Sequence, residues 1–249
     1  QAYKTFGLRE EWLDEFLIDP EYFWNENSLG TAQVDGFKAW LKDAEITDSK
    51  NNITDFGSLI KEVYLNDSDL AWELIWTDLA FNSFVINWFI ENVIVNQVFE
   101  KKTLVESICT SVPGAPSRTV ENAVTALLQT FSYSPIGKQF KCANTLGKKQ
   151  YQRGGYDNIS NIGLAYSIYR FAERIGTKSL RVSDFYDTDA DCSTCKIFGL
   201  SPSAFEKGLR SLNSEKNRVL IAELSMGLQH ITLRDDLNTN NIVRIMFGL

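Results

Sequence analysis

The sequence lacks the residues and loops on which the commonest enzyme classes rely. There is a single histidine, His230, so a Ser–His or Cys–His catalytic pair would have only one candidate base. This residue falls in a predicted β-wing, where a polar surface side chain is typical. No GxxxxGK[ST] or GxGxxG loop follows a strand-like segment, which excludes nucleotide binding through those loops. The chain therefore carries no complete catalytic motif, and whether it belongs to an enzyme stays open.

Cysteines and long apolar runs are also scarce. Four cysteines in 249 residues argue against a secreted disulfide scaffold and favour reduced thiols in the cytoplasm. Residues 1–20 are acidic and amphipathic, unlike a signal peptide. The most apolar stretch, 83–99, includes Asn87, Glu91 and Asn96 and is too short for a membrane span. We expect a cytoplasmic protein with no membrane partner and, since residue 1 is Gln1, a fragment or processed form.

Charge is distributed unevenly along the chain. Residues 1–100 hold 6 Lys/Arg against 19 Asp/Glu, whereas residues 101–153 hold 8 against 2 and residues 154–249 hold 11 against 11. The basic stretch either docks on the acidic first hundred residues or meets an anionic partner such as DNA.

Periodic apolar residues predict a mainly α fold with short β-wings. The predicted helices cover residues 10–18, 31–44, 54–65, 69–82, 83–99, 102–110, 117–131, 159–175, 182–186, 200–212 and 240–247. Pro20 is expected to end the first helix, and Thr54 and Ser201 are expected N-caps. The aromatic-rich helices 69–82 and 83–99 predict a central helical hairpin.

Helix pairs with turns between them suggest two to three winged-helix or helix-turn-helix units around this core. We expect an N-terminal winged-helix-like unit at 1–66, a helical core with a helix-turn-helix and a basic connector at 67–156, and a C-terminal winged-helix-like unit at 157–249. Alternation over 219–224 and 228–233, around Met226 and Gly227, predicts the hairpin of the last unit.

The helix at 117–131 and the basic connector at 138–153 form the candidate nucleic-acid surface. Lys and Arg neutralise phosphates, and Arg and Asn can read base edges. The candidate residues are Arg118, Asn122, Lys138, Lys141, Lys148, Lys149 and Arg153.

Cys192 and Cys195 form a CxxC pair, the spacing that lets two thiolates hold one metal ion. The missing ligands would have to be Cys142, Cys109 or His230, of which Cys142 is the candidate. No cofactor is the first expectation, and an iron–sulfur cluster or a zinc ion is the alternative. An isolated CxxC pair without a second pair favours two free cysteines in a loop.

The opening Thr5-Phe6-Gly7-Leu8-Arg9, followed by Glu10, Glu11 and Trp12, resembles the "TFPLRxxWL" start of an uncharacterised bacterial family. Residues 37–40, 55–57, 69–76, 81–82, 117–128 and 198–212 fall in the order expected for it. Members are often described as phosphoadenosine phosphosulfate (PAPS) reductases, or occur beside them and near DNA-modification and phage-defence genes. The chain has Tyr3-Lys4 where the family has Gly-His, and it lacks the SGGKDS-type loop of the reductase.

This resemblance implies a partner: a PAPS-reductase-like enzyme or a defence-complex subunit. Together with the basic stretch, it leads us to expect a non-catalytic, nucleic-acid-associated or complex-forming subunit that acts in DNA modification or defence. One alternative is an iron–sulfur or thiol domain of a PAPS-reductase-like oxidoreductase or sulfurtransferase. The other is a protein-interaction adaptor that does not bind DNA.

Overall fold

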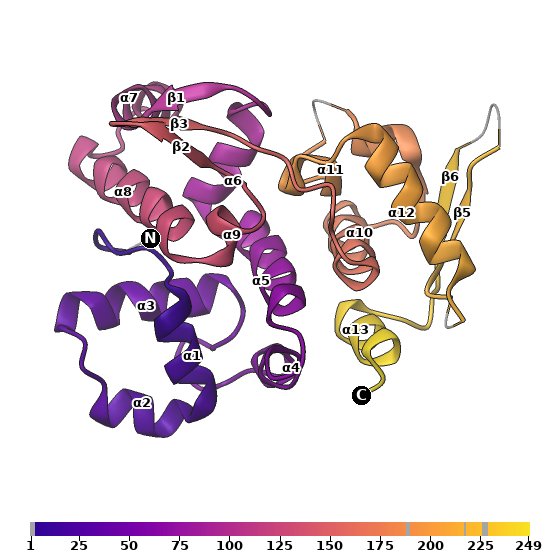
Figure 1. The fold of residues 1–249 in the computed structure, drawn as a ribbon, viewed down its shortest axis with the longest axis horizontal. Helices are drawn as coiled ribbons and strands as arrows, with labels where there is room; N and C mark the ends of the chain where they lie inside the picture. Colours follow the sequence, from indigo (N-terminus) through magenta and orange to yellow (C-terminus); the bar gives the residue numbers. More distant parts are fainter. Residues whose placement is uncertain (1–2, 188–189, 217, 226–228) are drawn as a thin grey trace.

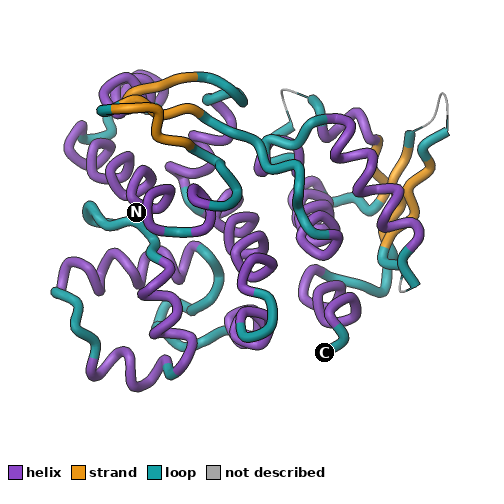
Figure 2. Tube along the Cα trace, viewed as in Figure 1, coloured by secondary structure: helices purple, strands orange, loops and turns teal. Residues whose placement is uncertain are grey.

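The chain folds mainly into helices, with two small antiparallel sheets (Figure 1). The computed structural model describes residues 3–187, 190–216, 218–225 and 229–249. Figure 2 shows the two sheets at opposite ends of the molecule, with helices between them. Among the described residues, no helix combines the length and the apolar character needed to cross a membrane.

The N-terminal third consists of four helices: α1 (Glu10–Ile18), α2 (Pro20–Glu26), α3 (Thr31–Asp43) and α4 (Asp55–Tyr64). Pro20 does end α1, but it also begins α2, because a proline at the first helical position loses no hydrogen bond. The N-cap of α3 is Gly30, whereas Thr54 caps α4 as predicted by accepting the Gly57 N–H. Within the described residues, the only β pairing between α3 and α4 is the isolated bridge Thr47–Ile53, so the wing expected in this unit is minimal.

Helix α5 (Ser68–Asn82) is the centre of the fold. It packs against α3, α4, α6, α9, α10 and α11, and its tryptophans Trp72 and Trp76 are fully buried. Helix α6 (Phe84–Asn92) follows α5 after the single residue Ser83 and packs against it, so the two apolar helices of the predicted hairpin are both present. The predicted helix over 83–99 is too long, because the chain turns after Asn92, with Asn96 in the left-handed region (φ 69°), and then forms a strand.

The first sheet belongs to a segment that has one strand, then three helices, then two strands. Its elements are β1 (Val98–Glu100), α7 (Lys101–Ser111), α8 (Ser117–Tyr133), the short α9 (Pro135–Lys138), β2 (Asn144–Gly147) and β3 (Gln150–Gln152). The strand order is β1-β3-β2, with both neighbours antiparallel to β3. The basic connector predicted over 138–153 is therefore largely a β-hairpin.

The last third repeats this arrangement. Its elements are α10 (Asn161–Ile175), β4 (Ser179–Arg181), the 3-10 helix η1 (Val182–Phe185), α11 (Thr194–Phe198), α12 (Pro202–Ser214), β5 (Leu220–Glu223), β6 (His230–Leu233) and α13 (Thr239–Phe247). The order β4-β6-β5 matches that of the first sheet. The predicted hairpin is confirmed in its strands, while its turn around Met226 and Gly227 lies outside the described residues.

Candidate nucleic-acid interface

Helix α8 presents its first turns to solvent and buries the rest of one face. Pro113, Gly114 and Pro116 end α7 and separate it from α8, and Gly114 adopts φ 90° with open space around it. Arg118 in the first turn of α8 is exposed, and Asn122 one turn later is half-buried. The inner face of α8 packs Val124 and Leu127 into the core. The exposed first turns are therefore fixed in direction by a well-packed helix.

The N-terminal motif that carries the family resemblance docks on the other end of α8. The Leu8 N–H donates to Thr130 Oγ1 (2.9 Å), and a Cβ on Gly7 would collide with the backbone of Thr130. The Arg9 guanidinium lies over the Tyr133 ring, 4.2 Å from its centroid. Glycine is required at this close approach, so the motif serves to fix α8.

The hairpin β2–β3 ends in two exposed lysines. Gly147 pairs with Gln150, so Lys148 and Lys149 form the turn, and Lys149 adopts φ 69°. Tyr151 on β3 stacks on Phe99 of β1, with ring centroids 5.7 Å apart. This stacking holds the hairpin on the short sheet and keeps the two lysines at its tip.

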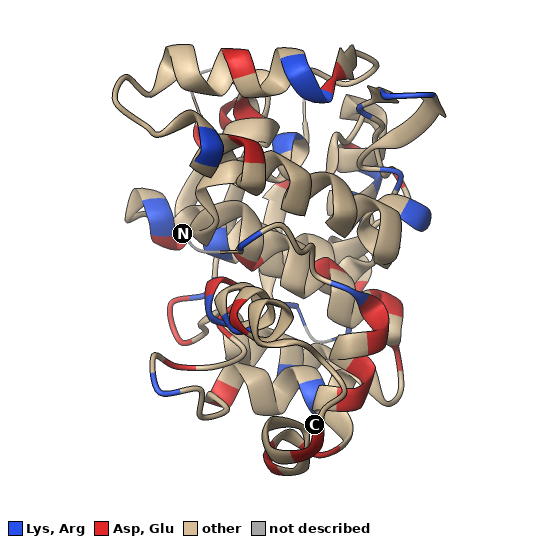
Figure 3. Cartoon of the chain, turned by 90° about the vertical axis from the view of Figure 1, so that its left-hand side faces the viewer, with Lys and Arg blue, Asp and Glu red and all other residues tan. Residues whose placement is uncertain are grey.

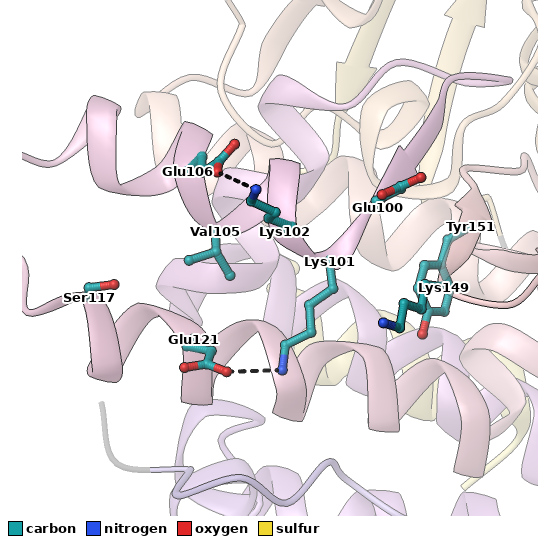
Figure 4. A pocket seen from close by; sticks show the side chains of 9 residues that line it. All are labelled: Glu100, Lys101, Lys102, Val105, Glu106, Ser117, Glu121, Lys149 and Tyr151. Carbon is teal, nitrogen blue, oxygen red and sulfur yellow. Dashed lines mark hydrogen bonds and ion pairs between the residues drawn. The ribbon is translucent and has the colours of Figure 1, made fainter.

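The hairpin and α8 share one surface. A cavity of about 550 Å³ is lined by Ser117 and Glu121 of α8, Lys101 of α7 and Lys149 and Tyr151 of the hairpin (Figure 4). Lys101 pairs with Glu121 (3.5 Å), and Glu121 also pairs with Arg118 (3.5 Å). Three lysines and three glutamates line the cavity, so its lining carries no net charge. The sequence alone does not single out Lys101 and Tyr151, since nothing in their local pattern separates them from ordinary surface residues.

The remaining connector lysines differ in their pairing. Lys138 forms an exposed ion pair with Glu10 (3.4 Å). Lys141, Lys148 and Lys149 are exposed, and no carboxylate lies within ion-pair distance of them in the part of the chain that the structure describes. These three amino groups are therefore free to meet an anionic partner.

Arg153 is not on this surface. Its side chain is buried, and its guanidinium donates to the carbonyls of Ile90 (2.6 Å), Val93 and Lys196. Burial lowers the pKa of Arg153 to about 10, which still leaves it charged at neutral pH. The expectation that Arg153 contacts nucleic acid is therefore corrected. The carbonyls at the end of α6 have no helical N–H donors, and the Arg153 guanidinium provides the donors instead.

Several acidic residues of the first hundred form ion pairs with cations of the last third. Arg170 pairs with Asp78 (2.8 Å) and Glu45 (2.9 Å), and Lys196 pairs with Glu91 (2.5 Å). Figure 3 shows acidic residues gathered in the lower half of the molecule, where Figure 1 places the N-terminal helices. Lys138–Glu10 is the one ion pair between residues 101–153 and the first hundred residues in the described chain.

The three candidate metal-binding cysteines are not brought together. In the described ranges, the one group of three metal-ligand atoms that lie within 4.8 Å of one another is Glu91, Asp191 and Cys192. Cys195 lies on α11, and Cys142 is buried next to Arg153. Burial raises the pKa of Cys142 and Cys192 to about 12 and that of Cys195 further, so the thiols are protonated.

The group at Cys192 is already satisfied by protein atoms. Lys196 Nζ pairs with Glu91, Arg174 pairs with Asp191 (3.0 Å), and the Cys192 N–H donates to Glu91 Oε1 (2.8 Å). Two cations already balance the two carboxylates, so the group needs no metal ion to neutralise it.

A buried carboxylate elsewhere has a perturbed pKa but a structural position. Glu73 of α5 accepts hydrogen bonds from the Ser160 N–H (3.0 Å) and hydroxyl (2.5 Å) at the start of α10. Burial raises the pKa of Glu73 to about 7. A Cβ at Gly163 would collide with this carboxylate, so glycine at this position lets α10 pack closely on Glu73.

The fold and the surface together define a mainly helical protein with two small three-stranded units, one of which has a basic hairpin. No family model and no curated protein matches the sequence. Two solved structures share the fold. A crystal structure of SspB superposes with a TM-score of 0.75 at 15% identity over 99% of this chain and 87% of that one. A magnesium ion-bound SspB structure gives 0.73 at 14% over the same shares.

Proposed function

We propose that this chain is a nucleic-acid-associated subunit whose contact surface is formed by α8 and the β2–β3 hairpin. The carrying observation is that Lys141, Lys148 and Lys149 have no carboxylate partner in the described residues while acidic residues are abundant in the chain. Phosphate oxygens are the partner that such a set of free ammonium groups suits best.

The chain order supports a winged-helix interpretation of both sheet units. Each has a strand, three helical segments and a hairpin, with strand order first–third–second. In the first unit, α8 would be the recognition helix and the hairpin would be the wing that contacts the neighbouring backbone. Arg118 can serve there despite Glu121, because an exposed ion pair is weak and phosphate can replace it.

The partner follows from the family resemblance. The chain would act with a PAPS-reductase-like sulfur enzyme or a defence-complex subunit in DNA modification, and it would contribute binding rather than chemistry. The magnesium ion bound in one of the two SspB structures belongs to that protein. At Glu91 and Asp191 of this chain the cations Lys196 and Arg174 take the place of a metal ion, so we assign no ion there.

Fluorescence anisotropy with labelled duplex DNA between about 50 and 200 mM NaCl tests the proposal. The variant Lys141→Gln, Lys148→Gln, Lys149→Gln should lose about tenfold or more in affinity, and its slope of log K against log salt should shrink by roughly 2 to 3. Lys50→Gln, an exposed lysine in a turn of the acidic region, is the matched control and should bind as the wild type does. Equal binding by the triple variant, or affinity that ignores salt, would refute the proposal and favour a protein-interaction adaptor.

A further inference from the structure

In the last third of the chain, α12 holds the place that α8 holds in the first unit. It follows β4, the short η1 and α11 and precedes the β5–β6 hairpin, while α8 follows β1 and α7 and precedes α9 and the β2–β3 hairpin, and the two sheets have the same strand order. The two helices are therefore equivalent in chain order, and whatever contacts the outer face of one has a counterpart surface on the other.

The outer face of α12 is polar and basic. Ser203, Lys207, Arg210 and Ser214 recur every three to four residues, so they lie on one side of the helix, and all four are exposed. The opposite side is buried in the core and consists of Phe205, Leu209 and Leu212. Two more exposed cations, Lys216 and Arg218, follow the end of the helix.

The acidic residues near this face do not cancel it. Glu206 reaches Arg210 at only 3.9 Å, and Glu215 accepts a hydrogen bond from the Asn161 amide (2.6 Å). Asp157 accepts from the Ser201 N–H and hydroxyl (both 2.8 Å), so its charge lies at the start of α12 rather than along the face. Lys207, Lys216 and Arg218 have no carboxylate within ion-pair distance in the described ranges.

We propose that the outer face of α12, with Lys216 and Arg218, is a second contact for the phosphate backbone of a double-stranded nucleic acid. One chain would then hold one duplex at two places, which deepens the proposed function and rests on α8 and the hairpin as the first contact. Ammonium and guanidinium groups neutralise phosphates, so the contact would be made by the side chains of Lys207, Arg210, Lys216 and Arg218.

The arrangement of the two units makes duplex length the informative variable. Figure 1 shows them on either side of α5 along the longest axis of the molecule. A duplex of about 30 base pairs is about 100 Å long and can bridge both surfaces, whereas one of about 10 base pairs fits a single surface. Once the first contact forms, the second is intramolecular and adds affinity on the long duplex only.

Anisotropy titrations with both duplexes test this. The variant Lys207→Gln, Lys216→Gln, Arg218→Gln should lose about tenfold or more on the long duplex and less than about threefold on the short one. Each comparison uses a single duplex, so the larger number of binding registers on the long one cancels. Lys50→Gln is again the control, and circular dichroism checks that each variant is folded.

The outcomes separate the two proposals. If the α12 variant binds both duplexes as the wild type does while the hairpin variant fails, the second contact is refuted and the proposed function stands. If the hairpin variant binds normally and the α12 variant loses affinity equally on both duplexes, bridging is refuted and the placement of the first contact on α8 falls with it. Loss on the long duplex in each variant, with short-duplex binding abolished only when the two are combined, is the expected result.

Discussion

Replacing Arg153 with methionine should destabilise the fold and leave the nucleic-acid surface intact. Methionine fills a similar space but donates no hydrogen bond. The carbonyls of Ile90 and Val93 then lose their donor, because the amide of Ile94 that would continue α6 donates to Gln97 Oε1 instead (3.0 Å). The Arg153 guanidinium also lies over the Phe89 ring, 5.4 Å from its centroid, so some packing is lost as well.

The magnitude follows from the carbonyls of Ile90 and Val93, because the third acceptor, the Lys196 carbonyl, keeps the Gly199 N–H as a donor (3.3 Å). Each buried acceptor without a donor costs about 1–3 kcal/mol, so the free energy of unfolding should fall by roughly 2–6 kcal/mol. In a chain of this size that lowers the melting temperature by roughly 5–20 °C. Urea denaturation followed by circular dichroism measures the change directly.

The matched variant is Arg118→Met. The Arg118 side chain is 79% exposed, so its loss should change stability by less than about 0.5 kcal/mol but should weaken duplex binding. The pair of variants thus separates an effect on folding stability from an effect on nucleic-acid binding. The reasoning fails if Arg153→Met unfolds at the wild-type urea concentration, or if it weakens binding while the protein is folded.

Two further predictions concern Glu73 and Gly7. The folded-state pKa of Glu73 is raised to about 7. Its protonated carboxyl therefore contributes to stability in full below about pH 4.5, and this contribution is lost as the pH rises through about 7. Glu73→Gln should therefore remove up to about 3 kcal/mol of pH dependence between about pH 4.5 and 7, seen as the wild-type minus variant difference in urea unfolding; an unchanged pH profile would contradict this. Gly7→Ala should cost about 1–3 kcal/mol because its Cβ meets the Thr130 backbone, whereas Gly147→Ala, with nothing within 4 Å, should be nearly neutral; equal melting temperatures for the two variants would contradict the docking of the N-terminal motif on α8.

The helices could be predicted from the sequence because their periodicity and caps are local. Thr54 and Ser201 cap α4 and α12 as expected, by accepting the backbone N–H of Gly57 and Ala204. The strands β2 and β3 could not be predicted from the sequence, since their residues are exposed or half-buried and show no apolar alternation. The prediction from Pro20 was incomplete, because a proline can begin a helix as well as end one.

The candidate site was predictable only in composition. The basic character of 101–153 is a property of the sequence, and the structure leaves Lys148 and Lys149 exposed. Arg153 has the same chemistry and lies only four residues further on, yet it is buried. Its role depends on carbonyls at the end of α6, about 60 residues away in sequence, and on one of α11, 43 residues away. No local sequence pattern reveals such contacts.

The pairing of charges explains how an acidic chain can present basic surfaces. The sequence left two partners open for the basic stretch, the acidic first hundred residues or an external anion. In the described chain the first hundred residues draw their buried partners from elsewhere, as Arg170 and Lys196 show. The Arg170–Asp78 pair lies in the core, where Asp78 is fully buried, whereas the pair Lys138–Glu10 is exposed and weakened by solvent. The hairpin lysines are thus left unpaired by the fold itself, and a partner that brings phosphates would meet no internal competitor for them.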